Sequence, residues 1–226
     1  MRRQISLEEI SDGRLYTLND MVKADCGGCR GCFACCKGMG NSIVLDPMDV
    51  WRLCTGLKKD FSWLAGAAVS LGMVDGLILP SLKMNGKEEA CFFLGEDGRC
   101  RVHSFRPGIC RIFPLGRYYE NDHFSYFLQI HECKKENRTK VKVKKWIDMK
   151  DPKVYDQFIR DWHYYLEELE EKVNAEEAKG DQEIRKAACL HVLTCFYQTP
   201  YQAESGDEEG FYREFYERLQ ESRKNK

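Results

Sequence analysis

Residues 26–36 read Cys26-Gly-Gly-Cys29-Arg-Gly-Cys32-Phe-Ala-Cys35-Cys36, so five thiols lie within eleven residues. Two residues separate Cys29 from Cys32, and two more separate Cys32 from Cys35. This spacing lets two sulfurs reach one metal, in tetrahedral zinc sites and in iron–sulfur clusters alike. Thiolates are soft ligands for zinc, Cu(I) and iron–sulfur clusters, whereas Mg²⁺ and Ca²⁺ prefer oxygen. The glycines allow the tight bends that converging sulfurs need. The segment therefore predicts a metal-binding loop.

The other seven cysteines fall into two groups. Four follow the loop at wider intervals and are candidate ligands: Cys91, Cys100, Cys110 and Cys133. Three lie in apolar or aromatic stretches and are expected as buried core thiols: Cys54, Cys189 and Cys195. Eight thiols cannot all bind one zinc ion, so a site that uses most of them is polynuclear or divided in two. Adjacent Cys35 and Cys36 either serve two metals, or one of them ligates while the other packs.

Composition narrows the class of protein. With 35 Lys and Arg against 36 Asp and Glu, the formal net charge of the 226 residues is -1. This balance argues against a nucleic-acid partner bound through phosphate neutralisation. No apolar run is long enough for a membrane span, and residues 1–6 have no apolar core behind them, as a secretory signal would. We therefore expect a cytoplasmic protein with metal ions as partners, in which 12 cysteines serve metal or redox chemistry rather than disulfides.

Residues 1–150 are predicted to form a cysteine-cluster metal-binding domain of the α+β class, with short strands and helices around an irregular core. Asp46-Pro47 indicates a helix start, because Asp caps helices and Pro suits their first position. Asp60 is a second such cap. We expect a strand pair in residues 115–130, with its turn at 120–122.

Residues 77–94 also read as extended, with a hairpin turn at Asn85-Gly86. Beyond them, a basic run extends from Lys134 to Lys145. A solvated edge strand, whose lysines prevent aggregation, is the favoured interpretation of this run. The alternative is a surface for RNA or an acidic partner.

Residues 151–226 are predicted to be a helical region that packs on the first domain. Apolar residues recur at helical spacing after Asp151-Pro152, Gly180-Asp181 breaks that helix, and a last amphipathic helix precedes the basic end. A second interpretation makes these helices a docking scaffold for a partner protein. It predicts an exposed apolar stripe along Phe158, Trp162 and Leu169.

The cysteines and their neighbours resemble a known family. Cys29-Arg-Gly-Cys32-Phe-Ala-Cys35-Cys36 is similar to the signature of the YkgJ-like CxxCxxCC cysteine-cluster family, described as zinc- or iron-chelating. The later segments Cys91-Phe-Phe-Leu, Asp97-Gly-Arg-Cys100 and Arg106-Pro-Gly-Ile-Cys110-Arg-Ile-Phe-Pro114 match its second half in order and spacing. The resemblance covers about residues 26–133. It implies these metal-binding positions, the last as an added eighth: Cys29, Cys32, Cys35, Cys36, Cys91, Cys100, Cys110 and Cys133.

The sequence leaves the metal open between iron and zinc. Cys26, Cys29, Cys32 and Cys36 reproduce the ligand spacing of bacterial ferredoxins, but Lys37 replaces the proline of that motif and no second copy exists. Five aromatic residues near the cysteines would supply a dry shell for a cluster, or are ordinary core: Phe33, Phe92, Phe93, Phe105 and Phe113. We favour an iron–sulfur cluster over zinc.

Two arginines and two histidines stand next to the candidate ligands. Arg106 and Arg111 flank Cys110, where they could donate hydrogen bonds to metal-bound sulfur, hold an anion in a fork, or form a structural ion pair. His103 and His131 could each replace a thiolate ligand. The sequence does not choose among these roles.

Three functions follow from the sequence. The first is a metal- or cluster-binding protein with a structural or accessory role. The second is a redox enzyme or electron-transfer protein that uses the same centre, and the third is the docking scaffold. No phosphate-binding glycine loop, nucleophile elbow or HExxH motif is present, so enzymatic activity is left open.

Overall fold

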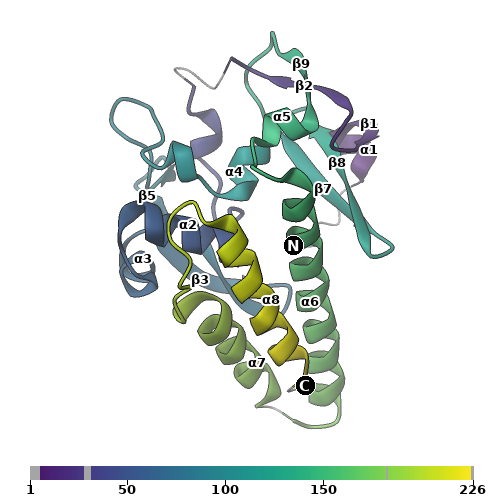
Figure 1. The fold of residues 1–226 in the computed structure, drawn as a ribbon. Helices are drawn as coiled ribbons and strands as arrows, with labels where there is room; N and C mark the ends of the chain where they lie inside the picture. The colour runs from purple at the N-terminus through teal and green to yellow at the C-terminus, as the bar shows by residue number, and fades with distance from the viewer. Residues whose placement is uncertain (1–5, 28–31, 182, 225–226) are drawn as a thin grey trace.

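A computed structural model describes residues 6–27, 32–181 and 183–224, and shows the expected α+β fold (Figure 1). The helices are α1 (Leu7–Ile10), α2 (Pro47–Leu57), α3 (Phe61–Ala67), α4 (Gly108–Ile112), α5 (Val143–Ile147), α6 (Pro152–Ala178), α7 (Ile184–Leu193) and α8 (Glu208–Lys224). Two 3₁₀ turns, η1 (Ala34–Cys36) and η2 (His103–Phe105), and a π-helical turn, η3 (Thr194–Gln198), join them.

A three-stranded antiparallel sheet has the order β1-β8-β7, formed by Ser11–Tyr16, His123–Gln129 and Leu115–Glu120. The predicted strand pair β7–β8 is confirmed, with Glu120 opposite His123 and a turn whose two residues, Asn121 and Asp122, have positive φ. A separate ribbon pairs β2 (Met21–Asp25) with β9 (Thr139–Lys142). The middle of the basic run is thus a strand of a two-stranded ribbon, with Lys140 and Lys142 exposed. This placement agrees with the solvated edge strand.

The helix starts were predicted correctly. Asp46 and Asp49 form a reciprocal capping box at the start of α2, and Asp60 Oδ1 accepts a hydrogen bond from Trp63 N in α3. The larger hairpin lies earlier than predicted. It pairs β3 (Val69–Val74) with β4 (Leu77–Leu82) around Asp75 and Gly76.

The predicted turn at Asn85-Gly86 joins only β5 (Met84–Asn85) and β6 (Ala90–Cys91), two residues each. Strand β3 escaped the sequence analysis because Ser70 and Gly72 interrupt its apolar pattern. Its pairing with the largely buried β4 is a tertiary contact.

Helices α6, α7 and α8 lie side by side, and α2 lies next to α8 (Figure 1). The rings of Trp51 on α2 and Phe211 on α8 stack with centroids 5.0 Å apart, and Trp51 Nε1 donates to Ala203 O. Tyr197 Oη donates to Leu45 O just before α2. The helical layer and the cysteine-bearing half therefore share one apolar core.

The prediction of an exposed stripe on α6 is wrong. Phe158, Trp162 and Leu169 are 0%, 6% and 8% exposed, and the rings of Phe158 and Trp162 pack against Phe215 of α8 and Phe196 of η3. Among the described helices, none combines the length and the apolar character that a membrane span requires.

Candidate metal centre

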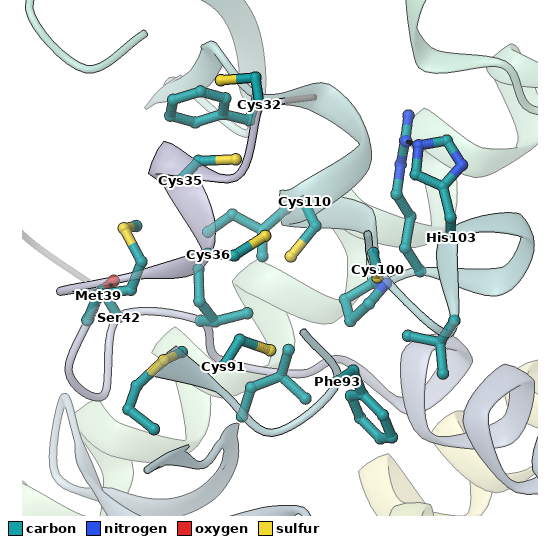
Figure 2. A pocket seen from close by; sticks show the side chains of 18 of the residues that line it. Cys32, Cys35, Cys36, Met39, Ser42, Cys91, Phe93, Cys100, His103 and Cys110 are labelled. Carbon is teal, nitrogen blue, oxygen red and sulfur yellow. Dashed lines mark hydrogen bonds between the residues drawn. The ribbon is translucent and has the colours of Figure 1, made fainter. Parts of the chain in front are cut away.

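Six of the predicted ligands line one cavity of about 430 Å³ (Figure 2). They come from three separate stretches of the chain: Cys32, Cys35 and Cys36 around η1, Cys91 and Cys100 on either side of a turn, and Cys110 in α4. The sulfurs of Cys36 and Cys110 point toward one another, and that of Cys91 points into the same space, whereas that of Cys32 lies at the outer end (Figure 2). The fold thus gathers thiols that are up to 78 residues apart in the sequence.

Backbone hydrogen bonds and one glycine hold the first cysteines against the later ones. Cys36 N donates to Phe33 O at 2.9 Å, and Gly38 N donates to Glu89 O at 3.0 Å, next to β6. Gly98 has φ +72°, and a Cβ there would stand 2.9 Å from Cδ1 of Phe33. A side chain at residue 98 would therefore displace the ring of Phe33, the residue before η1.

Cys110 is positioned from the buried side of α4. Gly108 N donates to Asp49 Oδ1 at 2.7 Å, and a Cβ on Gly108 would collide with Tyr155 Oη. Arg111 donates from its two terminal nitrogens to Asp148 O and Ser104 O, each at 3.1 Å. Arg111 is 6% exposed and is not among the residues that line the cavity, so its contacts match the structural role.

The thiols change one another's pKa through electrostatic interactions and a hydrogen bond. Burial raises the pKa of Cys91, Cys100 and Cys110, and the nearby sulfurs raise it further. A hydrogen bond between the adjacent thiols lowers the pKa of Cys35 to about 7 and raises that of Cys36. Several thiolates in this cavity would therefore repel each other unless a cation lay between them.

The donor set fits a soft metal. Sulfur dominates the wall residues that could ligate, which include the six thiols, the thioethers of Met39 and Met84, His103 and Glu132. Among the described residues, however, no group of three His, Cys, Asp or Glu side chains is already arranged around a single metal position. The eleven cysteines within the described ranges are all free thiols.

The remaining predicted ligands, Cys29 and Cys133, are not among the residues that the structure places on the cavity wall. Cys29 lies outside the described residues. Cys133 does not line the cavity, although Gln129 and Glu132 do, and its role as a ligand stays a prediction. His103 is on the wall and accepts a hydrogen bond from Arg106, whereas Cys26 and His131 are not on the wall.

The three expected core thiols lie away from the cavity. Burial raises the pKa of Cys54, in α2, to about 11. Cys189 is 4% exposed and accepts a hydrogen bond from Ile78 N. Cys195 is 3.8 Å from Ser222 Oγ, and burial raises its pKa. These surroundings are typical of thiols that pack rather than bind metal.

Sequence reasoning missed a second cavity, of about 650 Å³, which shares four wall residues with the first: Ser42, Ile109, Leu115 and Gln129. Arg117 lines it and donates to Tyr155 Oη at 3.1 Å. Asp46 and Asp49 also line it, and burial raises the pKa of both carboxyls. The capping box was recognisable in the sequence, but its place on a cavity wall depends on the tertiary fold.

The comparison with protein families settles the resemblance. The family model CxxCxxCC, described as a "putative zinc- or iron-chelating domain", matches residues 28–142, about half of the chain. The chain belongs to the CxxCxxCC family. The match includes all eight predicted ligands and ends with β9, so the helices α6 to α8 lie outside the family's domain. No curated protein and no solved structure shows a significant match to the chain.

Proposed function

We propose that this CxxCxxCC protein binds a polynuclear metal centre through the thiolates of the cysteine cavity, with a structural or accessory role. The observation that carries the proposal is the gathering of six thiols from distant segments around one cavity. Cys29 and Cys133 complete the proposed set of eight, as the family motif and its extension imply. A single tetrahedral zinc ion uses four ligands, so more thiols require more than one metal.

Iron, as an iron–sulfur cluster, is the metal we favour, with zinc as the alternative. Cys35 and Cys36 both line the same cavity, which is the arrangement expected when neighbouring thiols serve a polynuclear centre. The wall is otherwise largely apolar, with Ile43, Leu82 and Val102. Such a wall limits water around a cluster and tunes its potential.

The aromatic residues support this shell only in part. Of the five near the cysteines, Phe93 and Phe113 line the cavity. Phe105 instead packs against Gly56 of α2, and Phe92 against Trp63 of α3. These two belong to the ordinary core.

Electron transfer or redox catalysis is a second candidate function, and one observation favours it. The second cavity adjoins the thiols through shared wall residues, so a small molecule could lie next to a bound cluster. An iron–sulfur cluster would supply one-electron chemistry there. For this activity we expect dithionite to bleach the visible absorbance, and reoxidation by an added oxidant under anaerobic conditions to restore it.

Anaerobic purification with metal analysis tests the proposal. We expect a brown protein with a broad absorbance band near about 400 nm, acid-labile sulfide and several iron atoms per chain. A colourless protein with more than one zinc per chain would show that the metal is zinc rather than iron, and would leave the proposed thiolate centre intact. No bound metal after anaerobic reconstitution with either metal would contradict the proposal.

Two serine substitutions connect the metal to particular thiols. Cys110→Ser removes a wall thiol and should lower the metal content per chain, whereas Cys189→Ser removes a core thiol and should leave it unchanged. Equal metal content in both variants would refute the assignment of Cys110.

A further inference from the structure

Arg106 reaches the cysteine cavity from the turn between η2 and α4. Its side chain lines the cavity, and its Nη1 atom donates to Nε2 of His103. Its Nε atom is buried and has no hydrogen-bond partner. A buried donor without an acceptor destabilises the folded state. One N–H of Arg106 therefore needs an acceptor.

Thiols share the cavity wall with this guanidinium. Cys35, in η1, and Cys100, in the turn before η2, line the same cavity as Arg106. A thiolate accepts hydrogen bonds from a guanidinium N–H, so these two sulfurs are candidate acceptors for the unpaired Nε–H of Arg106.

Arg111 differs from Arg106 in its contacts and its place, although its Nε atom is also buried without a hydrogen-bond partner. Both of its terminal nitrogens are engaged by backbone carbonyls, and it lies off the cavity wall. Of the two, only Arg106 combines a place on the cavity wall with a buried N–H that has no acceptor.

A metal centre bound by several thiolates carries excess negative charge, which a cation at the position of Arg106 would offset. Four thiolates around one divalent ion, or six around two, leave an excess of two negative charges. Half-buried charge of this kind is costly unless it is paired and hydrogen-bonded. The other wall residues that can be charged are the exposed Arg99, His103 and Glu132.

We propose that Arg106 is a positioning residue of the metal centre, which donates from Nε to a metal-bound thiolate of Cys35 or Cys100 and offsets its excess negative charge. This inference rests on the proposed function. Hydrogen bonds to metal-bound sulfur orient the ligand and withdraw electron density from it, and therefore change both the affinity and the electronic spectrum of the centre.

Titration with Co²⁺ in an anaerobic buffer tests the role of Arg106. In Arg106→Gln, we expect the Co²⁺ affinity, measured by competition with a chelator, to fall by about 10- to 100-fold. The thiolate-to-cobalt charge-transfer band should shift, while the number of cobalt ions per chain stays the same. Arg213→Gln removes an exposed arginine from α8, away from the cavity, and should stay within about twofold of the unsubstituted protein.

Arg106→Lys separates the charge from the hydrogen bond, because lysine keeps the charge but has no Nε–H. We expect an intermediate affinity and a band that remains shifted. Circular dichroism of each metal-free variant shows whether it has kept the fold of the unsubstituted protein, and Arg106→Lys carries the test if Arg106→Gln has not.

Three outcomes would overturn the inference. The first is an affinity within twofold and an unchanged band in Arg106→Gln, and the second is complete rescue of both by lysine. The third is failure of the unsubstituted protein to bind Co²⁺, zinc or iron under anaerobic conditions, which would refute the proposed function itself and is distinguishable because all variants would then behave alike.

Discussion

The cysteine cavity and the interface between α6 and α8 differ in the type of side chain they contain and in how deeply it is buried. Around the cavity, all six wall thiols are only partly buried, and the strands β5 and β6 that support them have two residues each. Between the helices, Phe158, Phe211 and Phe215 are completely buried, and the rings of Phe158 and Phe215 meet edge to face at 4.7 Å.

The difference separates two sources of stability in one chain. Burial of large aromatic side chains stabilises the helices without any ligand. Short ladders and loops with thiols on their inner side contribute little by themselves. Segments of that kind commonly obtain their stability from the metal they bind. The two regions should therefore respond differently to the same disturbances.

Metal removal should produce the largest difference between the regions. In small zinc peptides, metal binding supplies about 10–16 kcal/mol of apparent folding free energy. After treatment with a chelator and a reductant, we expect residues 32–39 and 84–105 to lose protection from hydrogen exchange, while α2, α6 and α8 keep theirs. Mass spectrometry of peptides from the loaded and stripped protein measures this. Equal protection in the two forms would remove the contrast on which this expectation rests.

Truncation of Phe158 should have the next largest effect, and it acts on the other region. Phe158→Ala removes a fully buried ring from the aromatic cluster, and we expect the free energy of unfolding to fall by about 3–5 kcal/mol. Denaturant unfolding of metal-loaded protein measures the loss. Leu190→Ala is the matched control, because Leu190 is 62% exposed on α7 and its truncation should change stability by about 0.5 kcal/mol or less. Similar losses in both variants would contradict the assigned core.

Gly108 joins the two regions, and an alanine there should disturb both. Gly108 lies two residues before Cys110, and the added Cβ of Gly108→Ala would collide with Tyr155 Oη on α6. We expect a loss of about 1–3 kcal/mol in stability and lower metal occupancy. Tyr155→Phe removes the colliding oxygen, so the double variant should recover part of the loss. Gly66→Ala, in α3 with no atom within 4 Å of the new Cβ, is the control and should be neutral or stabilising.

Local signals in the sequence were sufficient for much of this architecture. Asp46-Pro47 and Asp60 predicted two helix starts correctly, because a cap is a contact between residues close in the sequence. The strand pair within 115–130 was predictable for the same reason. Its third strand, β1, comes from more than a hundred residues away, and no local pattern specifies that pairing.

The candidate site was predictable as a set of residues rather than as an arrangement. Cysteine spacing and the family resemblance identified the six thiols that line the cavity. They could not assign different roles to Arg106 and Arg111, since both flank Cys110 and only tertiary contacts distinguish them. Periodicity on α6 revealed an apolar face but not the partner, here α8 and η3, that covers it, so the sequence left open both the packed helix and the exposed stripe of the docking scaffold.

Asp156 offers the smallest and most specific test, because it joins α6 to β8 away from the cysteine cavity. Tyr126 Oη on β8 donates to its carboxylate at 2.6 Å, and burial raises the pKa of Asp156 to about 6, against the opposing effects of Tyr126 and Arg117. A carboxyl whose pKa is higher in the folded state than in the unfolded chain contributes stability below the unfolded value, near 4, and loses it as the pH rises through 6.

Asp156→Asn keeps the acceptor for Tyr126 but carries no charge. At pH 8 the variant should therefore be more stable than the unsubstituted protein by about 2 kcal/mol, and the gain should vanish near pH 4. Thermal unfolding across this pH range measures the difference. The gain should be the same before and after metal removal, because neither Asp156 nor its partner Tyr126 lines the cysteine cavity. A gain that depended on the metal would show that the helical layer and the cavity are energetically coupled, contrary to the contrast drawn between them.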